Sequence, residues 1–263
     1  MSDAQVRPII RRETLKRLGV AVGAGALALV MGPRRVIEAA CSKKPRLARY
    51  AMLVDLNRCI GCRSCTVACK AENQVPLGVF RTYVHYLEEG TYPETKRYFA
   101  PTFCNHCSEP PCVTACPVDP VKGVYKTSRG EEVEYERRAT YTRPDGLVLM
   151  DYDRCIGCHM CVKACPYGAR FVDPSRKAGG DPSNNTVGKC TYCVQRLDNG
   201  VVPSCVQTCL GGALIFGDLN DSSSEIAKKS RKAKVWKPKE GTKPNTYYVG
   251  LTHEAVLGEE VKS

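Results

Sequence analysis

The sequence predicts an α+β fold of small sheets, short helices and long loops, and three observations support this prediction. Alternating or apolar stretches typical of short strands recur at residues 50–55, 147–151 and 213–218. The stretches with helical character, at residues 63–73 and 222–233, are also short. Seventeen cysteines lie among these elements, at spacings that indicate bound metal.

The central motif spans residues 147–166, LVLMDYDRCIGCHMCVKACP. Its cysteines stand at C-x2-C-x2-C-x3-C and a proline follows, which is an iron-sulfur spacing. Three thiolates on one tight loop can hold three corners of a cubane cluster, while the fourth ligates the other cluster of a pair. One such motif implies a second, and residues 51–69, AMLVDLNRCIGCRSCTVAC, repeat it at an offset of 96 residues. The sequence therefore contains an internal duplication.

Two further sets of four cysteines complete the pattern. Sixteen of the seventeen cysteines fall into four sets along the sequence: Cys59, Cys62, Cys65 and Cys69; Cys104, Cys107, Cys112 and Cys116; Cys155, Cys158, Cys161 and Cys165; and Cys190, Cys193, Cys205 and Cys209. Structural zinc sites usually join two separated C-x2-C pairs, so a third cysteine two residues on would have no role there. A disulfide framework belongs to small secreted proteins, and adjacent C-x2-C-x2-C thiols are badly placed to pair with one another.

The segments around the first two sets are expected to be strand-rich. Residues 77–103 have the Tyr and Val spacing of one or two strands over a cluster, and Pro110 and Pro111 predict an extended turn before Cys112. Residues 121–146 are polar and charged, which predicts a surface hairpin with turns at Gly130 and at residues 144–146.

The remaining elements alternate with polar loops. Residues 169–173 are expected to form a strand and residues 174–188 an exposed loop. The eleven residues between Cys193 and Cys205 predict a short helix closed by Asn199 and Gly200. Seven basic residues between Lys228 and Lys239 are interpreted as a solvated face, with a partner or membrane-surface contact as the alternative. The stretch NTYYVGL near the C-terminus can add one strand to the core.

The N-terminal 41 residues predict an export signal. Residues 11–17, RRETLKR, carry paired arginines, and the weakly apolar residues 18–32 are too few to span a bilayer comfortably. The pattern resembles a twin-arginine signal, which serves the export of folded proteins. Trimming is expected at residues 39–42, and Cys41, the odd cysteine, has no expected ligand role.

The basic composition does not indicate a nucleic-acid partner. The net charge of +12 falls to +8 without residues 1–41, which hold seven Lys and Arg and three Asp and Glu. An oxidised cubane with four thiolates carries about −2, so four of them contribute about −8 and bring the loaded protein near neutrality. The basic residues are thus expected to compensate anionic clusters.

Several residues beside the motifs are candidates for supporting roles. Gly61 and Gly157 would let the backbone close around the sulfurs. Arg58 and Arg154, each directly before a first cysteine, are compensating charges or else face solvent.

The histidines and the lack of a substrate motif bear on the type of function. His106 and His159 lie inside cysteine loops, where packing is the favoured role and tuning of a cluster potential the alternative. The sequence has no nucleotide loop, no nucleophile beside a base and no flavin or haem signature. Fully ligated one-electron centres without a substrate site indicate electron transfer rather than catalysis.

The four cysteine sets, together with CNHCSEPPC at 104–112, CPYGARF at 165–171, KCTYCVQRLDNGVVPSC at 189–205 and the twin-arginine segment, resemble the iron-sulfur electron-transfer subunit of the molybdopterin (DMSO reductase-type) oxidoreductase family, and within it the tetrathionate and polysulfide reductase branch. The resemblance implies two interleaved ferredoxin-like modules, each with two [4Fe-4S] clusters. It divides the sequence into the signal segment 1–41, a first module of 48–103 with 186–220, an inserted second module at 104–185, and a C-terminal helix and tail at 221–263.

The resemblance also implies the ligand sets of four [4Fe-4S] clusters, with fourth cysteines exchanged within each module. The sets are Cys59, Cys62, Cys65 and Cys209; Cys190, Cys193, Cys205 and Cys69; Cys104, Cys107, Cys112 and Cys165; and Cys155, Cys158, Cys161 and Cys116. Some relatives lack the cysteine equivalent to Cys158 and lose an iron, so its presence here implies four complete cubanes. The charged segment 125–143 looks longer than in those relatives.

The function implied is transfer of electrons between a quinone-reactive membrane subunit and a molybdopterin catalytic subunit of a respiratory, sulfur-compound oxidoreductase, on the outer face of the cytoplasmic membrane. One alternative is the iron-sulfur subunit of a membrane complex linked to sulfite reduction, without a molybdenum partner. Two remote alternatives are a zinc-rich structural or nucleic-acid-binding protein and an enzyme with its own substrate pocket.

Overall fold

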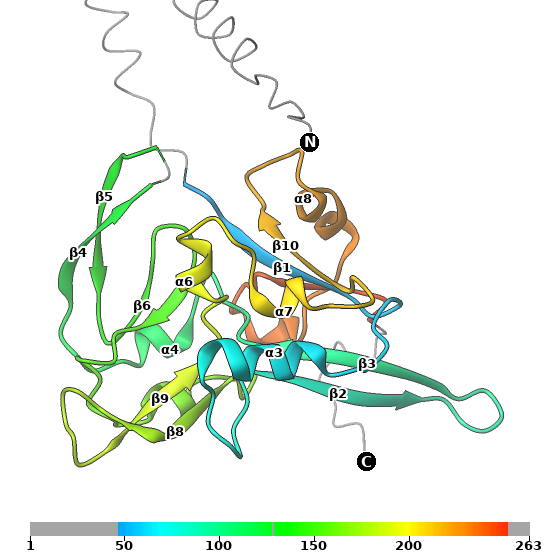
Figure 1. Ribbon diagram of the computed structural model, residues 1–263, viewed down its shortest axis with the longest axis horizontal. Coiled ribbons are helices and arrows are strands. Elements are labelled where there is room, and N and C mark those ends of the chain that lie inside the picture. The colour runs from blue at the N-terminus through cyan, green and yellow to red at the C-terminus, as the bar shows by residue number, and fades with distance from the viewer. Residues whose placement is uncertain (1–46, 128, 252–263) are drawn as a thin grey trace, which may run out of the picture. The chain divides into compact units, whose positions relative to one another are not determined.

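The computed structural model describes residues 47–251 except residue 128. The expected export signal, with Cys41, lies outside the described residues. Within them the protein forms one three-stranded sheet, four two-stranded sheets and short helices (Figure 1), an α+β arrangement as the sequence predicts. No helix in this part of the molecule has the length and apolar character needed to cross a bilayer.

The three-stranded sheet joins distant parts of the sequence. Its central strand β1 (Tyr50–Asp55) pairs antiparallel with β10 (Leu214–Asp218) and parallel with β11 (Thr246–Val249). Met52 and Val54 face the main core, while Ala51 and Leu53 face a smaller core covered by α8 (Glu225–Lys229). Because both faces are covered, β1 is apolar along most of its length. The predicted strands at residues 50–55 and 213–218 and in the C-terminal stretch are confirmed.

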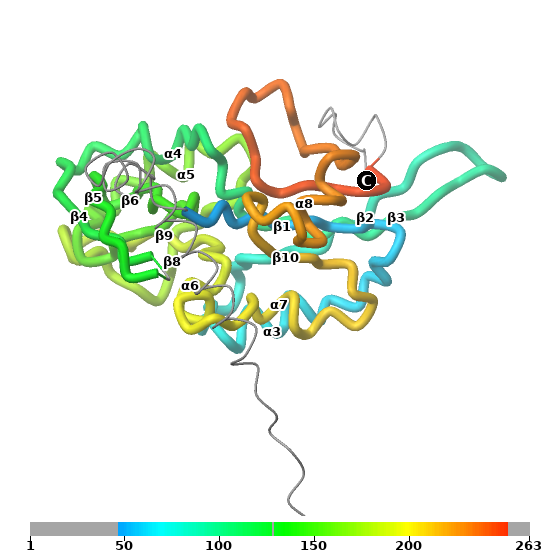
Figure 2. The backbone as a smooth tube through the Cα atoms, turned by 90° about the horizontal axis from the view of Figure 1, so that it is seen from above, coloured from blue at the N-terminus to red at the C-terminus, as the bar shows by residue number. Residues whose placement is uncertain are grey.

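A long hairpin and two helices adjoin this sheet. Strands β2 (Thr82–Glu89) and β3 (Lys96–Phe103) pair antiparallel, and the tip of their hairpin projects away from the other elements in Figures 1 and 2. Helix α3 (Ser64–Asn73) packs against β2 and against α7 (Ser204–Gln207). The helix predicted between Cys193 and Cys205 is α6 (Val194–Leu197), and the sequence reasoning missed α7.

Residues 104–189 gather on the side of the molecule away from the β2–β3 tip (Figure 2). Their elements are α4 (Pro111–Thr114), β4 (Val121–Lys126), β5 (Glu132–Arg137), β6 (Thr140–Thr142), β7 (Val148–Met150), α5 (Met160–Lys163), β8 (Arg170–Lys177) and β9 (Asn185–Lys189). They surround a separate apolar core that includes Val148, Val187 and four cysteines. The surface hairpin expected within 121–146 is confirmed as β4–β5, whose residues are largely exposed.

The expectation of an exposed loop at 174–188 is wrong. Strand β8 continues to Lys177, and β9 pairs with β8 from Asn185 onwards, so only the connection between them is a loop. Thr186 and Val187 of β9 are buried. The β8–β9 pairing crosses the expected module boundary between residues 185 and 186. Strand β11 adds part of the expected C-terminal segment to the sheet that contains β1.

The turn before Cys112 also differs from its prediction. Pro110 is extended, as expected of a residue before proline, but Pro111 begins α4. A proline fits the first helical position because its missing N–H would have no helical partner there. Two 3-10 helices, η1 (Ser230–Lys232) and η2 (Pro238–Glu240), complete the described elements and carry part of the basic segment.

Candidate metal centres

The two duplicated loops fold alike. In the first, Asp55 Oδ1 accepts a hydrogen bond from the backbone N–H of Asn57 at 3.1 Å. In the second, Asp151 Oδ1 accepts one from the backbone N–H of Asp153 at 3.2 Å. Each aspartate thus closes an Asx-type turn that directs the backbone from a strand into the cysteine loop. The internal duplication seen in the sequence therefore extends to the backbone.

The glycines of these loops are required by the backbone. Gly61 and Gly157 have φ values of +68° and +65°, in the left-handed region that favours glycine. A Cβ on Gly61 would lie 2.6 Å from the ring of Phe99, and one on Gly157 would lie 2.5 Å from Cβ of Asn184. The prediction that these glycines allow a tightly closed loop is confirmed.

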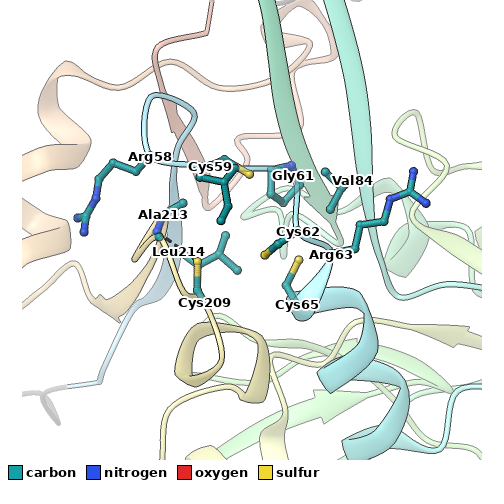
Figure 3. A pocket seen from close by; sticks show the side chains of 13 residues that line it. Arg58, Cys59, Gly61, Cys62, Arg63, Cys65, Val84, Cys209, Ala213 and Leu214 are labelled. Carbon is teal, nitrogen blue, oxygen red and sulfur yellow. Dashed lines mark hydrogen bonds between the residues drawn. The ribbon is translucent and has the colours of Figure 1, made fainter.

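One set of cysteines surrounds a small cavity beside β1 and α3. Figure 3 shows the side chains around it, and four cysteines from two distant segments belong to its lining: Cys59, Cys62, Cys65 and Cys209. Cys209 Sγ accepts a hydrogen bond from the backbone N–H of Ala213 at 3.2 Å, which holds its side chain in place.

A second set surrounds a cavity in the 104–189 region. Its lining includes Cys116 with Cys155, Cys158 and Cys161, together with Met150 and Val187. Here too, one cysteine comes from a separate segment of the sequence and three come from one loop.

The remaining eight cysteines form two interior sets. Asn73 Nδ2 lies 3.8 Å from Cys69 Sγ and 3.5 Å from Cys193 Sγ, so it approaches both sulfurs. Burial raises the pKa of the Cys205 thiol far above its ordinary value, and the neighbouring Cys190, Cys193 and Cys69 raise it further, followed by Cys65 of the first cavity-lining set. These contacts bring Cys69 together with Cys190, Cys193 and Cys205.

The other interior set lies around Cys107. Burial raises the pKa of the Cys107 thiol to about 12, and Cys104, Cys112 and Cys165 raise it as well because their charges lie close by. A thiol with such a pKa is protonated at neutral pH unless a metal ion replaces the proton. No three Cys, His, Asp or Glu side chains within the described ranges are grouped so as to hold a single metal ion.

The four sets differ in exposure. Cys62 and Cys158, one in each of the cavity-lining sets, are exposed, whereas the cysteines of the two interior sets are buried or, for Cys165, partly buried. None of the sixteen described cysteines forms a disulfide bond. The cysteine sets thus comprise two near the surface and two inside.

Two buried cations face the sulfurs, and the sequence reasoning missed both. Arg170 is 4% exposed, and its Nη2 donates a hydrogen bond to Cys112 Sγ at 3.0 Å. Lys189 is fully buried, and its Nζ donates to the carbonyl oxygens of Cys190, at 2.5 Å, and Val148. Neither cation has a salt bridge to Asp or Glu in the part of the molecule that the structure describes. Buried cations need compensating negative charge, so these residues fit anionic iron-sulfur clusters held by thiolates.

The arginines singled out from the sequence do not face the sulfurs in this way. Arg58 is exposed. Arg154 donates hydrogen bonds to the carbonyl oxygens of Arg137, at 2.9 Å, and Asp119, at 2.5 Å. Arg58 thus agrees with the alternative that the sequence left open, a side chain facing solvent. A side chain next to a ligand points away from the loop interior as readily as into it.

The two loop histidines make packing contacts. His106 is fully buried, its Nδ1 accepts a hydrogen bond from the backbone N–H of Val148 at 3.0 Å, and its ring stacks on Tyr192. His159 Nε2 lies 2.8 Å from the carbonyl oxygen of Asn185. These contacts agree with the packing role that the sequence favoured.

Comparisons with known proteins agree with this chemistry. Residues 95–219 match the 4Fe-4S dicluster domain, and residues 50–71 match the 4Fe-4S binding domain. The protein is 41% identical over 248 residues to the B subunit of the tetrathionate reductase of Salmonella typhimurium, covering 92% of this sequence and 88% of that one.

Two further relatives are named for other substrates. The B subunit of the selenate reductase of Mesobacillus selenatarsenatis is 37% identical, with 79% of this sequence and 74% of that one covered. The B component of the polysulfide reductase of Wolinella succinogenes is 36% identical, with 76% and 94% covered. The cysteine sets, the 4Fe-4S domains and these relatives together show that the protein belongs to the iron-sulfur electron-transfer subunits of the molybdopterin (DMSO reductase-type) oxidoreductases, the family of the tetrathionate and polysulfide reductase iron-sulfur subunits.

Proposed function

We propose that the protein is a four-cluster electron-transfer subunit that connects a quinone-reactive membrane subunit with a molybdopterin catalytic subunit of a respiratory, sulfur-compound oxidoreductase. The observation that carries the proposal is the gathering of sixteen cysteines into four sets, two with an exposed member and two inside. Electrons would enter and leave through the surface sets, and the interior sets would connect them.

Each set would hold one [4Fe-4S] cluster. The proposed ligand sets are Cys59, Cys62, Cys65 and Cys209; Cys69, Cys190, Cys193 and Cys205; Cys104, Cys107, Cys112 and Cys165; and Cys116, Cys155, Cys158 and Cys161. The contacts described above support this assignment, because each set draws its fourth cysteine from a separate segment, as in two-cluster ferredoxins. The clusters supply one-electron chemistry, while the protein supplies thiolates, burial and counter-charge.

The modules that carry these clusters would be interleaved. The two larger apolar cores support this arrangement. One lies among β1, β10 and the β2–β3 hairpin and also includes Leu147 and Leu149, and the other lies within residues 104–189. Electrons would then cross from one core to the other through the two interior sets.

Purification of the intact complex from membranes tests the partners. An affinity tag on the C-terminus should recover a molybdenum-containing subunit and an integral membrane subunit, and added quinol should reduce the clusters. A complex without molybdenum would instead support the alternative linked to sulfite reduction.

Export is tested separately. If residues 1–41 act as a twin-arginine signal, the double variant Arg11→Lys, Arg12→Lys should leave the loaded protein in the cytoplasm, with its iron content unchanged. The variant Arg34→Lys, Arg35→Lys, outside the paired motif, is the matched control. Normal export of the first variant would contradict an extracytoplasmic location reached by this route.

A further inference from the structure

Arg170 and Lys189 lie directly opposite each other in the β8–β9 hairpin. Both side chains are buried, at 4% and 0% exposure. Like charges directly opposite each other in a sheet are destabilising, and burial of a charge without a partner costs several kcal/mol more. No Asp or Glu of the described residues pairs with either side chain, so the cysteine sets between which they lie are the available source of compensating charge.

Arg170 lies between two of these sets. Its Nη2 donates to Cys112 Sγ at 3.0 Å, and its Nη1 lies 3.3 Å from Thr140 Oγ1 and 3.2 Å from Met150 Sδ. Thr140 and Met150 both belong to the lining of the cavity that Cys116, Cys155, Cys158 and Cys161 surround. The guanidinium therefore acts on the set of Cys112 and on the set of Cys161.

Lys189 lies at a different junction. Its Nζ donates to the carbonyl oxygens of Cys190 and Val148. The backbone N–H of Val148 donates in turn to His106, in the loop between Cys104 and Cys107. The ammonium group therefore acts on the set of Cys104 and Cys112 and on the set of Cys190. Neither cation belongs to the lining of the cavity that Cys59, Cys62, Cys65 and Cys209 surround.

We propose that Arg170 and Lys189 are the buried counter-charges that raise the reduction potentials of three of the four clusters, each cation acting on the two clusters that it separates. The inference rests on the proposed four-cluster function. Reduction adds one negative charge to a cluster, and a fixed cation a few ångströms away in a low-dielectric interior stabilises that charge. Because Arg170 and Lys189 are paired residues of one hairpin, the positions of both cations are fixed relative to the cysteines that they face.

The pattern of shifts distinguishes this idea from a general effect of burial. In the purified holoprotein, Arg170→Gln should move two midpoint potentials to more negative values, those of the clusters on Cys104, Cys107, Cys112 and Cys165 and on Cys116, Cys155, Cys158 and Cys161. Lys189→Met should also move two, sharing the first of these and adding the cluster on Cys69, Cys190, Cys193 and Cys205. The cluster on Cys59, Cys62, Cys65 and Cys209 should keep its potential in both variants.

The measurement is an anaerobic redox titration followed by electron paramagnetic resonance, with iron and sulfide counted in every sample. Arg154→Gln is the matched control, because Arg154 precedes Cys155 but donates to backbone carbonyls; it should move no midpoint as far. Arg170→Lys keeps the charge and should retain all clusters with midpoints close to wild type.

Four outcomes overturn the inference. Either no midpoint moves in Arg170→Gln, or all four move alike in that variant, or Arg154→Gln has an equal effect, or Arg170→Lys loses clusters or shifts the potentials as far as Arg170→Gln does. In each case a wild-type protein with its full iron and sulfide leaves the proposed function standing. A wild-type protein without them would overturn that function instead.

Discussion

The ring of His106 lies flat against the ring of Tyr192, with centroids 3.8 Å apart and an interplanar angle of 20°. His106 belongs to the loop between Cys104 and Cys107, and Tyr192 to the loop between Cys190 and Cys193. The stack therefore joins the two interior cysteine sets, which belong to different segments of the sequence. It is a direct packing contact between the proposed modules.

Truncation of Tyr192 tests the importance of this contact. Tyr192 is 1% exposed and its hydroxyl lies 3.1 Å from Thr246 Oγ1. Tyr192→Phe removes only a hydrogen bond and should cost about 1 kcal/mol, whereas Tyr192→Ala opens a cavity and should cost about 3–5 kcal/mol. Anaerobic urea unfolding followed by circular dichroism measures both. Equal losses in the two variants would show that the ring stack contributes nothing.

The buried ion pair of Arg143 gives a second prediction. Arg143 Nη2 donates to Asp145 Oδ2 at 2.7 Å and to Asp198 Oδ1 at 2.8 Å, and Asp145 is fully buried. Arg143→Met leaves the Asp145 carboxylate buried without its partner, so a loss of about 3–5 kcal/mol is expected.

The control for Arg143 is an exposed pair on the β2–β3 hairpin. The side chains of Arg97 and Glu88 are 63% and 55% exposed, so Arg97→Met should cost about 0–1 kcal/mol. The same unfolding measurement serves for both variants. A cost for Arg97→Met as large as that for Arg143→Met would contradict the interpretation by burial.

Tyr167 gives a prediction for alkaline pH. Its hydroxyl lies 2.6 Å from Thr242 Oγ1, and burial raises its pKa to about 12, from an ordinary value of 10.0. Because the unfolded protein loses this proton first, stability is fully present below pH 10 and is lost as pH rises from about 10 to 12. Tyr167→Phe should therefore flatten the pH dependence of stability in that range.

The measurement is the rate at which cluster absorbance is lost at fixed temperature. It is recorded as a function of pH for the wild type and for Tyr167→Phe. Tyr92→Phe, at a position 93% exposed on the hairpin tip, is the matched control and should follow the wild-type profile. The account of Tyr167 fails if its Phe variant follows that profile too.

Cys158→Ser tests the ligand assignment in the outer set of the 104–189 region. The variant should lose between about one and four iron atoms, depending on whether the cluster survives as a three-iron form, and its electron paramagnetic resonance spectrum should change. Cys41→Ser is the matched control, since Cys41 has no expected ligand role. An unchanged spectrum in Cys158→Ser would contradict the assignment.

Much of the fold could be predicted because its local signals are strong. Residues 50–55 are apolar between polar ends and form β1 with the predicted bounds. Gly61 and Gly157 indicate tight loops, and both have left-handed backbone conformations. The spacing of the cysteines indicates the metal chemistry, because thiolates at C-x2-C-x2-C can serve few other purposes.

The errors around the β8–β9 hairpin have a common physical cause. The polar character of residues 174–188 predicts an exposed loop, yet Thr186 is fully buried, and so is Lys189 directly after the segment. Lysine is almost never fully buried without a partner. A prediction from hydrophobic patterning takes no account of the negative charge of an iron-sulfur cluster, which can be that partner. Arg170 and Lys189 were missed for that reason. Position directly before a first cysteine singles out Arg58 and Arg154 instead, as compensating charges or as residues that face solvent.

The most direct test of the central claim is the content of iron and acid-labile sulfide in the anaerobically purified protein, with zinc measured in the same samples. The account predicts about sixteen iron and about sixteen sulfide per molecule, four of each for every cubane, and no stoichiometric zinc. Zinc without sulfide, or sulfurs bonded to one another in disulfides, would contradict it.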